Sequence, residues 1–328
     1  MAFKGLKDYT TAERFNGKQE ARMHLAYRKS MKNKFFNLLV FCKPKDIDPN
    51  GVDGAELVRI SWIDGLTGAK ARKIGIEGEP INVVRKTETI EMDAFNSTYE
   101  IDRRQIKSAQ EIPSVLKDNA DDATLSCVEL MVDKVFKAKV TKGDAFNGLD
   151  YYFEEGNALS GMNVSTVLNL DEGIVDSKTA LQFGNHLRKA LNGMGSNKAT
   201  AVVTTQRGLE LIQAYNQVTN VGIKYIKVND EEYTDFMGLN TCDMADSFFD
   251  EEVLAKGIPF YFIRLVKDKT GFVIVTKDGT IFDPIVPNLA KKLEDADGRV
   301  YQGSNEIVCA PVPCTIECAS RCFVTVGE

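Results

Sequence analysis

At 328 residues the chain is longer than one typical domain, and its apolar content of 43% is ordinary for a globular protein with a sizeable core. A net charge of −6 argues against a wholly basic nucleic-acid binder, although residues 1–34 alone carry nine Lys or Arg against three Asp or Glu. The seven cysteines include no Cys-x-x-Cys pair, and the sequence has neither an apolar leader nor an apolar run of membrane length. These features predict folding in a reducing cytoplasm with no membrane contact.

Residues 1–45 form the first predicted segment, a basic N-terminal arm. Thr10-Thr11-Ala12-Glu13 has the spacing of a capping box and predicts a helix that starts near Thr10. An apolar run follows the basic residues and needs burial: Phe35, Phe36, Leu38, Leu39, Val40 and Phe41.

Residues 46–104 are punctuated by Pro and Gly and contain two polar, strand-prone runs, Glu56–Ile63 and Val83–Met92. These runs predict a long two-stranded hairpin. Because such a hairpin is marginal in isolation, we expect it to lean on another chain. Residues 98–102 predict a returning strand.

Residues 118–153 predict one long helix followed by a sharp exit. Three acids suit its N-terminal end: Asp118, Asp121 and Asp122. Apolar residues then share one helical face: Leu125, Val128, Val132 and Val135. Lysines gather near the C-terminal end, where cations are favourable: Lys134, Lys137, Lys139 and Lys142. Gly143 suits a helix C-cap, and Phe146-Asn147-Gly148-Leu149 predicts a tight Asn-Gly turn.

Residues 149–259 predict an α/β lobe. Asp176 begins a helix with one apolar face, closed at Asn192-Gly193: Ala180, Phe183, Leu187, Ala190 and Leu191. Residues 201–203 predict a buried strand, and Thr204 or Thr205 then caps a helix with Leu209, Ile212 and Tyr215 on its apolar face. Residues 223–228 and 236–239 predict further strands around a polar turn at 229–232.

Residues 260–328 predict mostly strand. Phe260–Val266 and Phe272–Thr276 predict a hairpin, and residues 286–293 predict a short helix. Even positions from Val308 to Val326 are nearly all apolar, whereas odd positions are mostly polar and include Arg321. This alternation predicts one strand with a buried and a polar face, packed against the apolar face of the 118–153 helix.

No catalytic, cofactor or metal site is predicted. Four C-terminal cysteines invite a metal interpretation, but an extended strand keeps consecutive ones about 13 Å apart, so we interpret them as buried thiols: Cys309, Cys314, Cys318 and Cys322. Neither histidine, His24 nor His186, lies in a catalytic motif. The glycines at 193 and 195 follow a helix, the reverse of a phosphate-binding loop. Acid pairs at 121–122, 154–155 and 251–252 indicate helix starts or solvated faces rather than catalytic dyads.

The order of these parts, and most of all Gly143–Leu149, resembles the major capsid proteins of tailed bacteriophages, whose Hong Kong phage-type fold is shared with encapsulins. The resemblance implies an α+β fold with five parts: N-terminal arm (1–45), extended loop hairpin (46–104), peripheral domain with spine helix (105–148), axial domain (149–259) and closing strands returning to the peripheral domain (260–328).

The resemblance further implies a non-enzymatic shell protein that assembles with itself into pentamers and hexamers of an icosahedral head around double-stranded DNA. Implied partners are scaffolding, portal and decoration proteins, with non-specific DNA at the inner surface; the location is the virion, assembled in the host cytoplasm. For the basic arm, a solvated helix, contact with packaged DNA and contact with a neighbouring subunit are alternatives. We favour the neighbouring subunit because the apolar run at 35–41 needs burial.

Two alternatives to a phage capsid protein remain from the sequence. One is an encapsulin-type compartment shell, and another is an oligomeric α+β enzyme. Within the capsid interpretation, some relatives join a loop lysine to an asparagine of another subunit through an isopeptide bond, and Lys70 and Lys73 occupy the expected loop tip.

Overall fold

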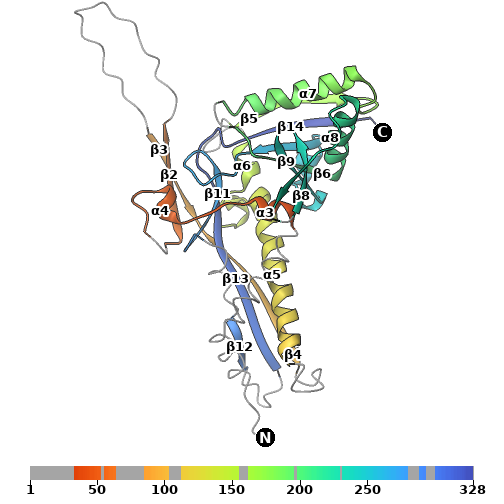
Figure 1. Ribbon diagram of the computed structural model, residues 1–328. Coiled ribbons are helices and arrows are strands. Elements are labelled where there is room, and N and C mark those ends of the chain that lie inside the picture. Colours follow the sequence, from red (N-terminus) through yellow and green to blue (C-terminus); the bar gives the residue numbers. More distant parts are fainter. Residues whose placement is uncertain are drawn as a thin grey trace, which may run out of the picture.

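A computed structural model describes residues 33–52, 55–63, 85–102, 112–154, 162–195, 198–229, 231–279, 288–292 and 300–327. The described elements form a broad upper lobe and a narrow lower part, and a two-stranded ribbon projects to one side (Figure 1). The expected helix near Thr10, His24 and the lysines Lys70 and Lys73 lie outside the described residues.

A seven-stranded sheet forms the centre of the upper lobe. Its order is β5 (Asn163–Leu170), β14 (Ala319–Val326), β10 (Ile258–Ile263), β6 (Ala201–Thr205), β9 (Leu239–Met244), β8 (Glu231–Phe236) and β7 (Tyr225–Val228). The β5–β14 and β6–β9 pairs are parallel and the others antiparallel. The sheet therefore combines neighbours in the chain with strands from its far end.

Both faces of this sheet are covered. Phe260 and Phe262 of β10 pack in one cluster with the helices α7 (Ser177–Asn192) and α8 (Gln206–Val218). Tyr261 and Ile263 alternate with them and join the main core on the other face. Because adjacent strand residues point to opposite faces, a doubly covered sheet buries both sets.

The two helices of this lobe confirm their predicted starts. Asp176 caps α7 by accepting a hydrogen bond from the Thr179 backbone N–H at 2.8 Å, and Thr205 caps α8 by accepting one from Gly208. Phe183 and Ile212 are fully buried, which confirms the predicted apolar faces. Local sequence was sufficient here because a cap and a periodic stripe lie within one helix.

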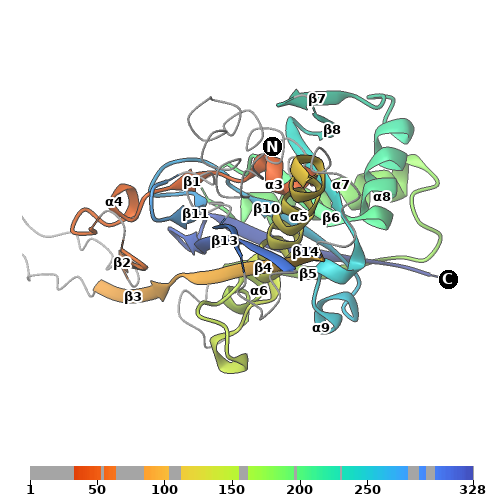
Figure 2. The ribbon, with the colours of Figure 1, turned by 90° about the horizontal axis from the view of Figure 1, so that it is seen from below.

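A second sheet has five strands and runs down the narrow part. They are β1 (Phe41–Cys42), β11 (Phe272–Thr276), β13 (Val300–Pro313), β12 (Asn288–Lys292) and β4 (Asp93–Asp102). The strand β4 pairs with β13 antiparallel along its whole length. The helix α5 (Ile112–Lys137) packs on both of these strands, as two perpendicular views show (Figures 1 and 2).

The predicted long helix has different ends in the structure. It begins at Ile112, so the three acids at 118–122 lie within it rather than at its cap, and it ends at Lys137 rather than at the predicted C-cap, Gly143. A 3-10 turn, η2 (Val140–Lys142), and a short helix, α6 (Leu149–Tyr152), follow. Gly143 does adopt a left-handed conformation, with φ of 96°, but it ends η2 and not the helix.

Two predictions about strands in the C-terminal quarter are wrong. The hairpin at 260–276 does not form, because β10 pairs with β6 and β14 whereas β11 pairs with β1 and β13. The single strand from 308 to 326 is two strands in different sheets, since β13 ends at Pro313 and β14 starts at Ala319. Only β13 packs on α5.

The segments that join the two sheets run beside each other. Arg264 donates its backbone N–H to the Cys318 carbonyl at 2.9 Å, and Cys314 donates to the Gly271 carbonyl at 3.1 Å. The two crossings, residues 264–271 and 314–318, therefore lie side by side where they connect the upper lobe to the narrow part.

Two smaller predictions also fail. Residues 236–239 are not a strand, because Met237 and Gly238 form the turn between β8 and β9 with positive φ of 54° and 85°. Residues 288–292 form β12 rather than part of a helix, since they pair with the β13 residues 301–304, which lie beyond the reach of a helical turn. The expected strand over 223–228 is confirmed as β7.

The apolar run after the basic arm is buried within its own chain. It forms α3 (Lys34–Leu38) and β1, and a short helix α4 (Pro44–Ile47) follows. Phe35 packs on Phe136 of α5 with ring centroids 5.1 Å apart. The prediction that the 35–41 run needs a neighbouring subunit for its burial is therefore wrong.

The projecting ribbon confirms the two predicted strands, β2 (Leu57–Ile63) and β3 (Arg85–Glu91), paired from Leu57–Glu91 to Ile63–Arg85. Its base is anchored, because Val58, Ile60 and Ile90 are buried in the main core. The remaining short elements are η3 (Asp246–Phe248) and α9 (Glu251–Leu254).

Candidate functional site

A buried ionic cluster lies where the chain leaves α5 and enters the upper lobe. Arg321 of β14 donates from Nη1 to Asp150 Oδ1 of α6 at 2.6 Å, and the Tyr261 hydroxyl of β10 donates to the same oxygen. Both charged side chains are 3% exposed. The Arg321 guanidinium also lies 4.5 Å from the ring centroid of Phe153. The cluster ties α6 to the two strands.

The chemistry of this cluster is structural. Burial raises the pKa of Asp150, while the nearby Arg321 charge and the Tyr261 hydroxyl oppose that rise. Burial likewise raises the pKa of Tyr261 well above its ordinary value. The contacts hold α6 against β10 and β14, and we assign the cluster the role of fixing this junction.

The sequence interpretation missed this cluster. Arg321 was assigned to a polar face, but it is buried on the face that carries Tyr261. An arginine between Cys322 and Ala319-Ser320, in a strand otherwise made of small and apolar residues, was the available signal. Its partner is 171 positions away, so no local pattern could identify it.

In place of the tight turn predicted at Phe146–Leu149, the chain after α5 forms a folded-back segment in which Gly148 is extended. Gly148 donates its backbone N–H to the Ala138 carbonyl at 2.7 Å, and Asn147 Oδ1 accepts from the Val140 N–H at 3.0 Å. Gly148 has an ordinary φ of −77°. A glycine is required at position 148 because its backbone lies close to the end of α5. A Cβ there would lie 2.4 Å from the Phe136 carbonyl oxygen.

The lysines at the helix end serve as ion-pair partners for this segment. Lys134 pairs with Asp144, and Lys139 pairs with Glu154 at 2.9 Å. Neighbouring carboxylates, Glu154 first, raise the pKa of Lys139, and Lys134 helps to lower the pKa of Asp144. These charges fix the turn rather than only offsetting the helix dipole.

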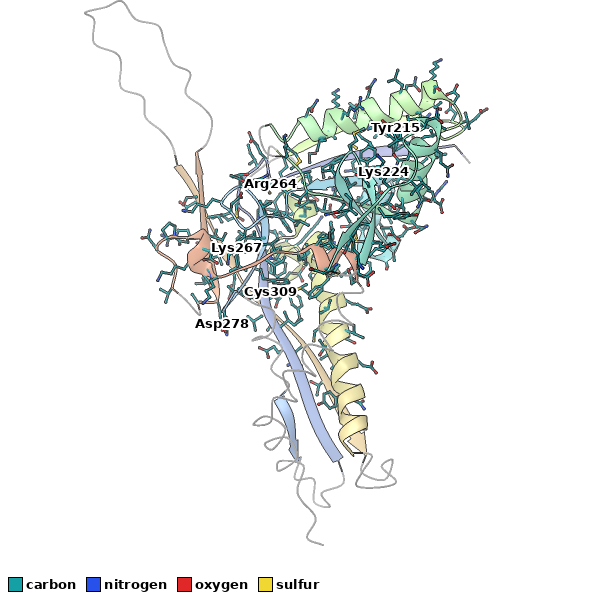
Figure 3. The ribbon with its side chains drawn as sticks, viewed as in Figure 1. Tyr215, Lys224, Arg264, Lys267, Asp278 and Cys309 are labelled. Atoms are coloured by element: carbon teal, nitrogen blue, oxygen red, sulfur yellow. The ribbon has the colours of Figure 1, made fainter. Side chains whose placement is uncertain are left out.

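The C-terminal cysteines and His186, considered above as candidate reactive residues, occupy structural positions. The predicted burial of the C-terminal thiols is confirmed for Cys309, Cys318 and Cys322, while Cys314 is half-buried; Cys309 lies where β13 enters the body (Figure 3). Burial raises the pKa of Cys314 to about 12. His186 of α7 donates from Nε2 to the Phe323 carbonyl at 3.0 Å, and burial lowers its pKa.

Acidic clusters among the described residues do not form a metal site. No group of three or more His, Cys, Asp or Glu side chains is arranged there to hold an ion. Glu251 and Glu252 lie in the first turn of α9, as expected for a helix start. Lys267 at the 264–271 crossing (Figure 3) pairs with Asp46 at 3.0 Å and lowers the pKa of that carboxyl.

Unpartnered surfaces are the features most relevant to function. Within the described chain, the ribbon β2–β3 pairs only with itself, and the edge strands β5 and β7 each pair on one side. Large apolar side chains are exposed on the upper lobe: Val167, Val175, Leu181, Val221, Tyr225 and Met237. Edges and exposed apolar residues together indicate surfaces that meet other chains.

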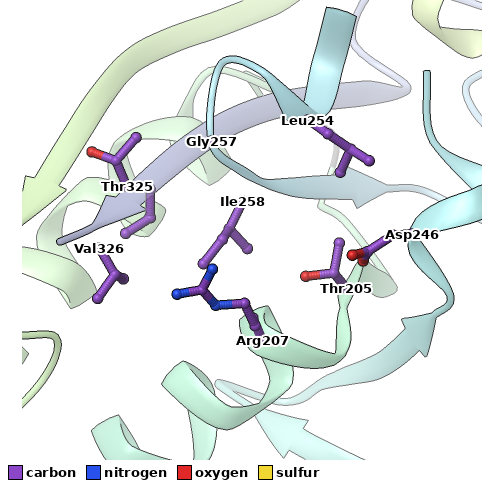
Figure 4. A pocket seen from close by; sticks show the side chains of 9 residues that line it. Thr205, Arg207, Asp246, Leu254, Gly257, Ile258, Thr325 and Val326 are labelled. Carbon is purple, nitrogen blue, oxygen red and sulfur yellow. The ribbon is translucent and has the colours of Figure 1, made fainter. Parts of the chain in front are cut away.

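Two cavities are formed by described residues. One, shown in Figure 4, lies between the start of α8 and the end of β14, and Thr205, Arg207 and Ile258 help to line it. The other lies between β3 and the folded-back segment after α5.

Among the described helices, none has the length and apolar character needed to cross a membrane.

Comparison of the sequence with protein-family models and with curated proteins finds no match in either case. Solved structures do match. The holo-SrpI encapsulin complex from Synechococcus elongatus PCC 7942 is similar with a TM-score of 0.54 at 10% identity, covering 89% of this chain and 86% of that chain.

Two further solved structures are similar to this chain. Microbacterium phage Oxtober96 matches with a TM-score of 0.51 at 10% identity, covering 83% of this chain and 86% of that one. The capsid of a native GTA particle matches with a TM-score of 0.50 at 9% identity, covering 84% and 86%.

These similarities define the class of fold. The chain has the α+β shell-protein fold that a GTA capsid and an encapsulin share, which confirms the fold expected from the sequence resemblance. Because identity is so low, the likeness concerns the fold, and the division into five parts remains a prediction.

Proposed function

We propose that this chain is a major capsid protein that assembles into pentamers and hexamers of an icosahedral phage head enclosing double-stranded DNA. The observation that carries the proposal is the fold similarity to a capsid and an encapsulin over more than 80% of each chain. Neither of these structures is named as an enzyme, and the clusters described above offer no catalytic arrangement.

The shape of the subunit supports assembly with copies of itself. A ribbon paired only with itself, two open sheet edges and exposed apolar side chains give several separate contact surfaces. Many weak contacts per subunit produce a stable closed shell through multivalency, while single contacts remain reversible enough to correct errors.

Charge supports a DNA-filled shell. The whole chain has a net charge of −6 although residues 1–34 are basic. An acidic body binds DNA weakly, which permits packaging and release, because phosphate contacts dominate non-specific affinity. Scaffolding, portal and decoration proteins, and a virion location after assembly in the host cytoplasm, complete the proposal.

An encapsulin-type compartment is the second candidate, favoured by the TM-score of 0.54 with the SrpI encapsulin complex. A shell of that kind holds protein cargo, whereas a phage head holds DNA. The contents of particles made in the native host therefore separate the two.

Electron microscopy of the purified protein tests the proposal. We expect closed shells with five-fold and six-fold clusters of subunits. A discrete small oligomer under every assembly condition would contradict both shell candidates and favour the oligomeric α+β enzyme. On a denaturing gel of the shells, monomer-sized protein alone would exclude an isopeptide bond from Lys70 or Lys73.

A further inference from the structure

The cavity between β3 and the segment after α5 has a volume of about 240 Å³. We call it the Glu88 pocket, and its walls include Glu88, Ile90, Phe146, Asn147, Tyr151 and Tyr152. For scale, a protein cavity of ~150 Å³ is large enough for benzene. The Glu88 pocket can therefore hold the long side chain of another residue.

One carboxylate in this pocket has no compensating charge among the described residues. Glu88 Oε2 is buried, and it has no hydrogen-bond partner. Burial raises the pKa of Glu88, and no described charge contributes to that shift in either direction. No Lys or Arg is among the described residues that line the pocket. A half-buried carboxylate left in this state costs free energy unless a cation arrives.

A second polar group in the same pocket is also unsatisfied. Tyr152 is 1% exposed, and its hydroxyl has no hydrogen-bond partner. Glu88 lies close enough to contribute to the raised pKa of the Tyr152 hydroxyl, after burial itself. Since more than nine-tenths of buried polar groups are satisfied in folded proteins, two orphaned atoms on residues that line one cavity indicate an absent partner.

The walls suit an alkylammonium group. Tyr151 and Tyr152 stand nearly perpendicular, with ring centroids 5.4 Å apart and planes at 86°. Aromatic faces beside a carboxylate attract cations, and apolar walls such as Ile90 and Phe146 suit a methylene chain. Glu88 has one buried oxygen without a partner, and a single acceptor fits the single charged point of lysine better than the two-pronged arginine.

We propose that the Glu88 pocket receives a lysine side chain from a second copy of this chain, with Glu88 as its counter-ion and the Tyr152 hydroxyl as a further acceptor. The occupant follows from charge complementarity and from the pocket's position at the base of the projecting ribbon. This inference rests on the proposed shell function, because it needs a neighbouring copy.

The lysine contact would act as an assembly lock. In the free subunit Glu88 remains uncompensated, whereas in the shell the ion pair forms inside a partly desolvated pocket. Charge pairs of that kind contribute more to association than exposed pairs do.

The first test substitutes the carboxylate without changing its shape. Glu88→Gln should raise the protein concentration needed for shell assembly by about tenfold or more. The matched control is Glu91→Gln, an exposed residue on the same strand and the opposite face. It makes the same change in charge and should leave assembly unchanged.

Unfolding in urea separates assembly from folding. Because Glu88→Gln removes an uncompensated charge, we expect the dissociated variant to be at least as stable as the wild-type subunit. Equal assembly of wild-type and Glu88→Gln protein would overturn the inference, as would a loss of assembly explained by a less stable subunit.

The second test identifies the partner directly. Shells are assembled from a mixture of ¹⁵N-labelled and unlabelled subunits and treated with a carbodiimide, which joins a carboxylate to an adjacent amine with loss of water. We expect the Glu88 peptide to be joined to a lysine peptide of the other label. Glu88 left unmodified, or joined only within one chain, would contradict the proposal. If wild-type protein forms no shells at all, the proposed function itself fails, which is a distinguishable result.

Discussion

The upper lobe and the narrow lower part bury their sheets in different ways. The seven-stranded sheet has α7 and α8 on one face and the main core on the other, so Phe260 and Tyr261 are both fully buried although they point in opposite directions. The narrow part has α5 lying along β4 and β13 (Figure 1). Its buried side chains belong to the main core, which also covers one face of the lobe sheet.

This difference indicates how each region tolerates change. The doubly covered lobe draws on both clusters, whereas the narrow part draws on the main core alone, to which α5 contributes the residues that we call the α5 seam: Val128, Met131, Val132 and Val135. The ionic cluster at Asp150 joins the regions at α6, and the paired crossings at 264–271 and 314–318 join them again.

Val132→Asp should abolish soluble folded protein and hence shell assembly. Val132 is fully buried in the α5 seam, where an unpaired carboxylate would be desolvated without compensation. The measurement is the yield of soluble protein and of shells. Lys137→Ala, on the same helix with a partly exposed side chain, should be tolerated. Normal shells from Val132→Asp would mean that the seam is not the core of the narrow part.

Arg321→Met should destabilise the subunit by about 3–5 kcal/mol, because it leaves the Asp150 carboxylate buried without its cation. Urea unfolding measures this loss. The double variant Arg321→Met with Asp150→Asn removes both charges and should recover part of it. If the double variant is as unstable as the sum of the two single variants, the pair is not coupled as the geometry indicates.

Gly148→Ala should be more destabilising than Gly143→Ala. The new Cβ at 148 would meet the Phe136 carbonyl oxygen at 2.4 Å, whereas at 143 nothing lies within 4 Å and only the left-handed φ of 96° opposes alanine. For Gly143→Ala we expect about 1 kcal/mol. Thermal unfolding of both variants decides the order, and the reverse order would show that conformation matters more than closeness at this turn.

His186→Gln should slightly flatten the dependence of stability on pH. Burial lowers the folded-state pKa of His186, so its contribution is present above the ordinary histidine pKa and is lost as the pH falls through the lowered value. Chemical unfolding between pH 7.5 and pH 5, in which ~6.5 is the unperturbed value, measures the difference between wild type and variant. Identical slopes would mean that His186 ionises as freely when folded as when unfolded.

The sequence by itself determined the local elements and their caps. Asp176 and Thr205 cap helices as predicted, the strands β2 and β3 lie within the expected runs, and Val128, Val132 and Val135 form the buried stripe of α5. Each depends on residues close together in the chain, where periodicity and capping act directly. The order of these elements also indicated the shell-protein fold.

Tertiary structure alone decided which strands pair and which charges meet. β10 and β11 are close neighbours in the chain, yet each takes partners in a different sheet, and β4 pairs with β13 about two hundred positions later. Arg321 Nη1 contacts Asp150 and the Tyr261 hydroxyl in the core, whereas Glu88 Oε2 has no such partner within the described chain. The physical reason is that strand pairing and charge compensation depend on residues that are neighbours in space. The alternation of apolar and polar residues within one strand does not specify those neighbours.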